Sequence, residues 1–274
     1  MLKSKIKEKK RKLEEILKKS GKILIAYSGG VDSTFLLKMA VDCVGVENTG
    51  VFIEKSEVDS DSEIRFARDF ANSLGVKTFF VKSSKLDDCN FSKNPVDRCF
   101  FCKKELFSKM AEFAKKHGYN AIADGSNYDD KVDYRPGSKA KSLYNVISPL
   151  QMAGLTKEEI RLLSRRIGLP TWNKPQMACF ASRIPYGEEI TEEKLKRIMK
   201  AEEYLYTFGL KIVRVRDYGN LCRIEVAETD FKKILKNKEE IVEKLKKTGY
   251  LFITLDLEGY RTGSLNKEIL MDSR

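Results

Sequence analysis

Long apolar stretches are missing from this sequence of 274 residues. No run approaches the ~20 apolar residues that a helix needs to span a bilayer. The first residues, MLKSKIKEKKRKLEEILKK, also lack the apolar segment of a secretory signal peptide. We therefore expect a soluble, cytoplasmic protein with no membrane partner. Internal repeats are absent too, and the basic N-terminus is the only low-complexity tract.

Histidine is almost absent, with His117 as the single example, whereas six cysteines are present. Cysteines in a chain without a secretion signal argue against a disulfide framework, because cytosolic thiols are kept reduced. Each cysteine is therefore a candidate for a metal site, a cluster, catalysis or simple burial. We expect burial for Cys43 and Cys222, and we assign no role to Cys89.

Basic residues outnumber acidic ones by 52 to 40, which gives a formal charge of +12. Clustered lysine and arginine favour nucleic-acid binding, because they release counterions from phosphates. Much of the excess lies between Lys3 and Lys19, where glutamates at helical spacing indicate an exposed helix. Charge alone leaves both interpretations open.

Alternating strands and helices fill the first half of the chain. Strands are predicted at 22–26, 49–53, 76–81 and 121–123, and helices at 33–41, 59–74 and 103–116. This order predicts an α/β, Rossmann-like domain whose parallel sheet is covered on both faces, with ligands at the carboxyl ends of the strands. The polar segment 124–141 is too long for an ordinary connection, so we expect a functional loop there.

A second, smaller module is predicted after a helix over 156–167. Its expected elements are a helix at 191–208, strands at 211–216 and 221–226, a helix at 229–248 and a strand at 251–255. This order indicates a small α+β domain. We place the boundary near Pro185, which gives domains of residues 1–184 and 185–274.

The stretch IAYSGGVDSTFLL joins a predicted strand to a predicted helix through Ser28, Gly29, Gly30 and Ser33. Such a junction presents backbone N–H groups and a helix N-terminus to an anion. The glycines permit positive φ and close approach of phosphate oxygens, and the serine hydroxyls add hydrogen bonds or cap the helix. No Gly-Lys-Ser/Thr follows, so this is not a Walker loop, and a plain capping turn is the alternative.

The pattern SGGxDS resembles the PP-loop of the N-type ATP pyrophosphatase superfamily, which includes GMP synthetase, NAD synthetase and tRNA thiolases. That resemblance implies that ATP binds through its pyrophosphate and activates a substrate by adenylation. It also implies that Asp32 helps to hold Mg²⁺ and that the main chain from Val51 to Ile53 faces adenine. Mg²⁺ is expected because it offsets the charge that develops when the α-phosphate is attacked.

Further segments resemble the LarE family of ATP-dependent sulfur transferases. They are NPVDRCFFCKKELF at 94–107, ADGSNYDDKVDYRPG at 123–137, WNKPQMACFASRIPYGEEIT at 172–191 and RVRDYG at 214–219. The resemblance implies a role in assembling the nickel-pincer nucleotide. A carboxylate of pyridinium-3,5-biscarboxylic acid mononucleotide would attack the α-phosphate of ATP, and sulfur would then displace AMP. The family also suggests a homo-oligomer, a hexamer built from dimers.

Two sulfur sources are open within this resemblance. Cys99 and Cys102 form a C-x-x-C pair and Cys179 lies beside SRIPYG, a pattern similar to proteins that hold a [4Fe-4S] cluster on three cysteines. The fourth iron would bind exogenous sulfide. In other members a cysteine, here Cys179, gives up its own sulfur once. A closed zinc site is not expected, since His117 lies at the far end of the same helix, and a redox dithiol needs no third cysteine.

The implied substrate carries carboxylates and a phosphate, so cationic and hydroxyl side chains are expected to converge on it. The candidates are Arg98, Lys103, Ser182, Arg183, Arg214 and Arg216. An exposed helix start or strand edge is the alternative for the charged ones. Asp124 and Asn127 are expected near ribose, Mg²⁺ or the adenylate. By resemblance, Glu202 and Asp230 are metal or phosphate-site groups, with helix-surface charge and capping as the alternative.

Two other functions compete with sulfur transfer to a small molecule. A tRNA thiolase agrees with the charge of +12 and the three cysteines, although neither a zinc ribbon nor a separate RNA-binding module is evident, so a nucleic-acid partner is not expected. A nucleotide-binding regulator without catalysis is the other. Exchange of pyrophosphate into ATP distinguishes the three functions. A sulfur transferase for a small molecule requires the carboxylate substrate for exchange, a thiolase requires RNA, and a regulator shows no exchange.

Overall fold

The computed structural model describes residues 2–131, 136–175 and 178–265. The chain folds into two compact units. The first comprises residues 1–83 and 97–177, and the second comprises residues 84–96 and 178–274. The second unit thus consists mainly of the residues from 178 onward, together with the short segment 84–96 from the first half of the chain. The domain boundary inferred from the sequence, between 184 and 185, stays a prediction.

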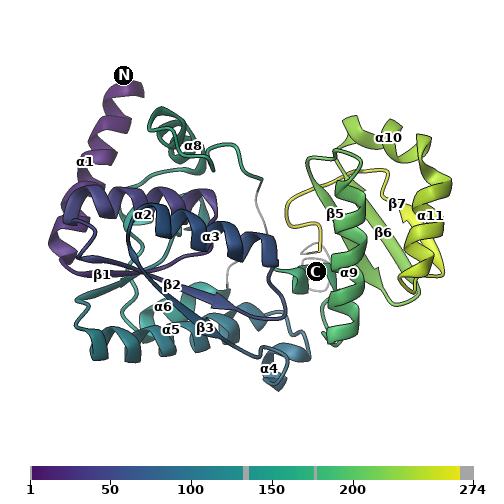
Figure 1. Cartoon of the computed structure of the whole chain (residues 1–274), viewed down its shortest axis with the longest axis horizontal. Coiled ribbons are helices and arrows are strands. Elements are labelled where there is room, and N and C mark those ends of the chain that lie inside the picture. Colours follow the sequence, from purple (N-terminus) through teal and green to yellow (C-terminus); the bar gives the residue numbers. More distant parts are fainter. Residues whose placement is uncertain (1, 132–135, 176–177, 266–274) are drawn as a thin grey trace, which may run out of the picture. The chain divides into compact units, whose positions relative to one another are not determined.

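A four-stranded parallel sheet forms the centre of the first unit, which confirms the predicted α/β, Rossmann-like fold (Figure 1). Its strands, in the spatial order β3-β2-β1-β4, are β1 (Ile23–Ala26), β2 (Thr49–Lys55), β3 (Lys77–Lys82) and β4 (Ala121–Ala123). The α-helices of this unit are α1 (Leu2–Ser20), α2 (Val31–Val44), α3 (Asp61–Ser73), α5 (Arg98–His117), α6 (Lys139–Leu143), α7 (Pro149–Met152) and α8 (Lys157–Arg166). Two 3₁₀ turns, η1 (Asp129–Lys131) and η2 (Pro136–Ser138), lie between β4 and α6.

Both faces of this sheet are buried, because successive side chains of a strand point to opposite faces. Ile23 and Ile25 of β1 pack in a core that includes residues of α1, α2 and α8. Leu24, between them, packs in a second core with Phe107 of α5. Figure 1 shows α2 and α3 on one side of the sheet and α5 and α6 on the other.

The order in which strands are added to the sheet reverses at β1. β2 and β3 follow on one side of β1, whereas β4 pairs on the other side. A crevice forms at the carboxyl end of a strand where the order reverses, and ligands of open α/β sheets bind there. The loop after β1, residues 27–30, therefore lies where a nucleotide is expected.

The helix predicted at 103–116 begins five residues earlier, at Arg98, with Asp97 in the N-cap position. It ends at His117, and the C-cap residue Gly118 has the left-handed φ of 68° that suits this position. The early start places Cys99 and Cys102 within the first two turns of α5, on one side of the helix. No helix in the described part of the chain is long and apolar enough to cross a membrane.

The second unit has a three-stranded mixed sheet and follows the predicted α-β-β-α-β order. Its strands are β5 (Val213–Tyr218), β6 (Leu221–Val226) and β7 (Phe252–Leu255). β5 and β6 are antiparallel, and β6 and β7 are parallel. The helices of this unit are α4 (Cys89–Ser92), α9 (Glu192–Tyr206), α10 (Phe231–Lys236) and α11 (Lys238–Lys247), with 3₁₀ turns η3 (Phe180–Arg183) and η4 (Glu228–Asp230).

The expectation of one continuous helix over 229–248 is wrong. The chain forms η4, α10 and α11 instead, and Asn237 is the C-cap of α10, which ends at Lys236. The Asn237 side-chain nitrogen donates to the Lys233 carbonyl at 2.7 Å. An asparagine side chain that bonds nearby backbone competes with the helix, which explains the break.

Removing Phe35 tests the core of the first unit. This side chain is fully buried on α2, so Phe35→Ala is expected to lower the free energy of unfolding by about 3–5 kcal/mol. Urea unfolding followed by the fluorescence of Trp172, which lies in the same unit, measures the change. Leu143→Ala, at a side chain that is 58% exposed, is the control and should shift stability by less than about 0.5 kcal/mol. Equal losses in the two variants would contradict this account of the core.

Candidate functional site

The loop between β1 and α2 is shaped to admit an anion. Gly29 has a φ of 70°, and a Cβ at this position would lie 3.0 Å from the Ala67 Cβ of α3. Both the backbone angle and the space thus require glycine. Gly30 is the N-cap of α2 and offers no capping side chain, so the first N–H groups of this helix are suited to an anion. The hydroxyls of Ser28 and Ser33 lie 3.2 Å apart across the loop.

Asp32 is the acidic side chain of this loop. Its Oδ2 accepts from Lys157 Nζ at 2.6 Å and from Asn127 Nδ2 at 3.3 Å. Its Oδ1 is buried and has no hydrogen-bond partner among the described residues. Burial raises the pKa of Asp32 above its usual value, although Lys157 and Asn127 act in the opposite direction. The free oxygen suits a cation such as Mg²⁺, which prefers carboxylate ligands.

Asp124 lies at the end of β4, on the same edge of the sheet. Its carboxylate accepts from the hydroxyls of Ser126 at 2.7 Å and Ser148 at 2.6 Å. Lys141 Nζ is 3.3 Å away and Lys103 Nζ is 3.9 Å away. Burial alone would raise the pKa of Asp124, but the two ammonium groups and the two hydroxyls together hold it below its usual value. The surroundings of Asp124 thus favour its ionised form.

The segment after β4 packs directly on the start of α2. A Cβ on Gly125 would lie 3.0 Å from the Ser33 backbone nitrogen, so glycine permits this close approach. Asn127 is oriented by its own loop, because its backbone N–H donates to Asp130 and its side-chain oxygen accepts from the Asp129 N–H. The structure therefore brings Asn127 to the loop residue Asp32, as a shared site requires.

The cysteine pair of α5 belongs to this same unit. Cys99 is exposed and Cys102 is half-buried. Lys103, next in the helix, reaches toward Asp124, and a Cβ on Gly137 would lie 3.0 Å from the Cys99 carbonyl oxygen. The cysteines thus start a helix whose next residue faces the carboxyl edge of the sheet.

Cys179 belongs to the second unit, where it precedes η3 in the N-cap position. Its carbonyl oxygen accepts from the Ser182 hydroxyl at 2.8 Å and from Arg183 Nη1 at 3.0 Å. Arg183 is fully buried, and its guanidinium forms a bidentate pair with Glu202 at 2.8 and 2.9 Å. Glu202 also accepts from the Val215 N–H. Arg183 and Glu202 therefore hold the Cys179 turn against the sheet.

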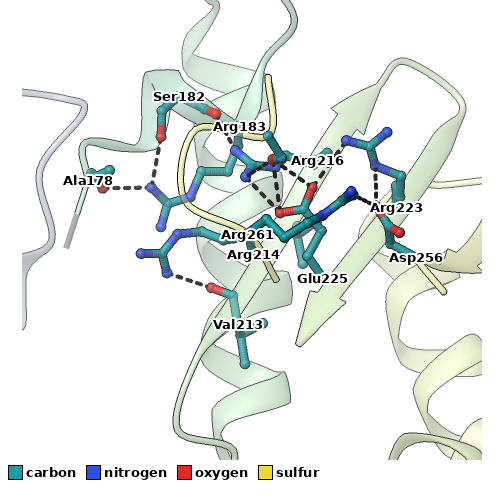
Figure 2. Close-up of polar contacts among 12 residues, drawn as sticks. Ala178, Ser182, Arg183, Val213, Arg214, Arg216, Arg223, Glu225, Asp256 and Arg261 are labelled. Atoms are coloured by element: carbon teal, nitrogen blue, oxygen red, sulfur yellow. Dashed lines mark hydrogen bonds and ion pairs between the residues drawn. The ribbon is translucent and has the colours of Figure 1, made fainter. Parts of the chain in front are cut away.

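Arginines gather on the sheet of the second unit (Figure 2). Arg214 and Arg216 lie on the same face of β5, and both are buried. Arg216 is directly opposite Arg223 of β6 in the strand register, a like-charge pair that is unfavourable without an anion. Glu225 supplies one, because it accepts from Arg216 at 2.7 Å and from Arg223 at 3.1 Å.

This arginine cluster keeps unused donor capacity. Arg216 donates to the Ser182 carbonyl at 2.6 Å, but its Nε has no hydrogen-bond partner among the described residues. Arg261, which Figure 2 draws beside it, also has an Nε without such a partner in that part of the chain. Buried donors without partners are costly. A bound anion that accepts from them would remove that cost.

Three further predicted site residues lie in β2, at the start of α5 and in η4. Ile53 is fully buried in β2. Arg98, at the start of α5, is buried rather than exposed. Asp230 forms an ion pair with Lys233 at 3.0 Å. Within residues 2–131, 136–175 and 178–265, no group of three or more histidine, cysteine, aspartate or glutamate side chains is arranged to hold a metal ion.

Several residues at these sites were missed by sequence reasoning. Lys141, Lys157, Lys174 and Glu225 contact the loop, Asp124 or the arginines, and Arg261 shares Asp256 with Arg223. Spacing gave no signal for them, because Lys157 and Lys174 lie 125 and 145 residues from their partners in the loop. The nearest sequence signal is for Lys157, which lies inside the Thr-Lys-Glu-Glu capping pattern at 156–159 and therefore at the first position of a helix.

Comparisons with known proteins agree with this geometry. A family model described as NAD synthase matches residues 5–94, which include the loop. A pyridinium-3,5-bisthiocarboxylic acid mononucleotide synthase of Lactiplantibacillus plantarum is 35% identical over 258 residues, 94% of each chain. The chain belongs to the LarE family. An uncharacterized protein of Synechocystis sp. is 41% identical over 93% of this chain and 97% of its own length. An uncharacterized protein of Methanocaldococcus jannaschii is 34% identical over 89% of this chain and 92% of its own length.

Membership of the LarE family confirms the resemblance seen in the sequence. The match to the synthase covers nearly the whole chain, so it includes both the PP-loop unit and the unit that carries the arginines. Both are therefore features of a LarE-family protein, and the loop is a PP-loop of the kind that implies ATP with Mg²⁺.

Substitution of Asp32 and of Asp124, the two carboxylates at the sheet edge, is expected to change stability in opposite directions. The folded-state pKa of Asp124 is depressed, so its contribution is fully present above about pH 4 and is lost as the pH falls through the folded value. The folded-state pKa of Asp32 is raised, so its ionised form opposes folding at neutral pH. Asp124→Asn should therefore lower the urea midpoint at pH 7, and Asp32→Asn should leave it unchanged or raise it.

Trp172 fluorescence reports both variants, because the two aspartates and Trp172 share the first unit. Asp124→Asn should also unfold with a smaller pH dependence between about pH 5 and 3 than the parent protein. A loss of stability at pH 7 in Asp32→Asn as large as in Asp124→Asn would contradict the assignment of the two environments.

Proposed function

We propose that this protein is an ATP-dependent sulfur transferase. Its substrate would be pyridinium-3,5-biscarboxylic acid mononucleotide, and its product the bisthiocarboxylic acid that the name of the Lactiplantibacillus synthase specifies. The observation that carries the proposal is a PP-loop on an uncapped helix N-terminus, in a chain that matches this synthase over 94% of its length. Adenylation is needed because a carboxylate is a poor electrophile.

The loop and its neighbours would orient the reaction at phosphorus. Backbone N–H groups at the start of α2 bind the pyrophosphate part of ATP. A substrate carboxylate oxygen bonds to the α-phosphorus while the bond to pyrophosphate breaks, which gives an acyl-adenylate. Mg²⁺ fits at Asp32, whose Oδ1 is free within the described chain, and would offset the charge that builds up on the phosphates. Asp124 and Asn127 would bind the ribose or the adenylate.

The second step replaces AMP by sulfur. A sulfide bonds to the acyl carbon, the carbon–oxygen bond to AMP breaks, and a thiocarboxylate remains. Two rounds convert both carboxylates. The arginine cluster, with Arg214 and Arg216, would hold the substrate phosphate, because bidentate guanidinium donors match phosphate oxygens. The unused Nε of Arg216 supports this assignment.

The sulfide carrier is the finer part of the proposal. The thiolates of Cys99, Cys102 and Cys179 have the donor chemistry of a [4Fe-4S] cluster with one open iron. Cys99 and Cys102, three residues apart on α5, are accessible or partly so, whereas Cys179 belongs to the other unit. The described residues give no three-ligand set, so the cluster rests on the residue pattern. Use of the Cys179 sulfur itself is the alternative.

Exchange of labelled pyrophosphate into ATP tests adenylation. Exchange should require the biscarboxylate nucleotide, and Asp32→Asn should reduce its rate about tenfold or more, the effect of ~1.4 kcal/mol in the transition state. Asp42→Asn, at the far end of the same helix, is the matched control and should retain the rate. Exchange without any carboxylate, or only with tRNA, would count against this function. No exchange at all would favour a nucleotide-binding regulator.

Iron content tests the sulfur carrier. Protein purified without oxygen should be brown and contain iron, and Cys99→Ala should lose both, because one of three ligands is removed. Cys89→Ala changes an exposed cysteine with no assigned role and should keep the iron. Colourless protein, or a mass loss equal to H₂S after one turnover, would instead assign the sulfur to Cys179.

A further inference from the structure

The PP-loop carries no positive side chain of its own. Its residues are Ser-Gly-Gly-Val-Asp-Ser, so the one charge it contributes is the negative charge of Asp32. A Walker loop, in contrast, includes a lysine that reaches the phosphates of the nucleotide. A triphosphate at this loop therefore needs cations from elsewhere in the fold, because backbone N–H groups carry only partial charges.

Lys157 brings one cation to the loop from α8. Its ammonium bonds to Asp32 Oδ2 at 2.6 Å, and its side chain is 29% exposed. The start of α8 is firmly placed, because Thr156 and Glu159 form a capping box and Lys9 of α1 bonds to Glu159 at 2.7 Å. The backbone N–H of Lys157 also donates to Asp129. The fold thus fixes the base of this side chain and leaves its tip within reach of solvent.

Lys174 brings a second cation from the segment that precedes residue 176. Its ammonium donates to the Gly29 carbonyl oxygen at 3.1 Å. Glu63 of α3 lies 2.5 Å away, and the ring of Phe66 lies 4.1 Å below the ammonium. The side chain is only 17% exposed. The ammonium is thus shared between Glu63 and the backbone of the anion-binding loop, and a phosphate at the loop would compete with Glu63 for it.

We infer that Lys157 and Lys174 are the pyrophosphate-binding cations of the nucleotide site. The inference rests on the proposed function, since it takes ATP as the ligand of the loop. Lys157 and Lys174 contact the same six residues, at the fifth position, Asp32, and the second, Gly29. When the triphosphate binds, each ammonium can donate to a phosphate oxygen while the N–H groups of α2 do the same. Lys157 also balances Asp32 when the loop holds no nucleotide.

Direct binding of three probes tests this inference. Isothermal titration should measure α,β-methylene ATP, inorganic pyrophosphate and adenosine against the parent protein, Lys157→Met and Lys174→Met. Each variant should bind the methylene ATP and pyrophosphate about tenfold or more weakly, because a charge-assisted hydrogen bond contributes at least that factor. Adenosine affinity should not change, because adenosine has no phosphate. Lys157→Arg and Lys174→Arg should recover part of the loss.

Lys38→Met is the matched control, because Lys38 lies on α2 and pairs with Asp42 away from the loop. It should bind all three probes as the parent does. A second comparison places Lys157→Met in an Asp32→Asn background, where pyrophosphate affinity should still fall. That result separates a cation that contacts phosphate from one that only neutralises the carboxylate.

The outcomes distinguish this inference from the proposed function. Failure of the parent protein to bind methylene ATP would overturn the proposed function and with it the basis of the inference. Binding by the parent and by both methionine variants with equal affinity would overturn the inference alone. Equal losses for adenosine and ATP, or a loss that the arginine variants do not recover, would assign the lysines a structural role and overturn it as well.

Discussion

The N–H groups at the start of α2 lack a side-chain cap because Gly30 holds the N-cap position, and the first unit is arranged around that feature. Uncapped N–H groups attract an anion. Gly29 allows the loop to turn beneath that anion, and Gly125 allows the segment after β4 to touch Ser33. A side chain at any of these three glycines would cap, fill or displace the space an anion needs.

The second unit contains two sets of buried charged side chains, the pair Arg183 and Glu202 and the arginines of β5. Arg183 and Glu202 are fully satisfied by each other and by nearby backbone, so this buried pair fixes geometry. Arg216 and Arg223 lie directly opposite each other on two strands and share Glu225, while Asp256 pairs with Arg223 and Arg261. The Nε of Arg216 nevertheless has no hydrogen-bond partner in the described part of the chain, and a buried donor without a partner is unfavourable. A ligand anion that accepts a hydrogen bond from this Nε would remove that cost.

Local patterns predicted the fold better than they predicted the site. Strand β1, the loop and α2 follow from neighbouring residues, and so do the two alternating strands of the second unit. The sequence predicts Arg183 as a substrate group, and its pairing with Glu202 is a contact that spacing did not indicate. Pattern reasoning extended one helix through Asn237, because a side-chain bond to backbone leaves no trace in hydrophobic spacing. Lys157 and Lys174 were invisible since only the tertiary fold brings them to the loop.

The contrast between Asp32 and Asp124 separates two uses of a carboxylate at one sheet edge. Asp124 is surrounded by donors, so its charge stabilises the fold and organises Lys103 and Lys141. Asp32 keeps one oxygen unpaired, and its burial is not fully compensated. Stability alone would favour a neutral side chain there. The ionised form is reasonable if a cation joins it during turnover, which makes the poorly compensated carboxylate, rather than the well-bonded one, the group that points to chemistry.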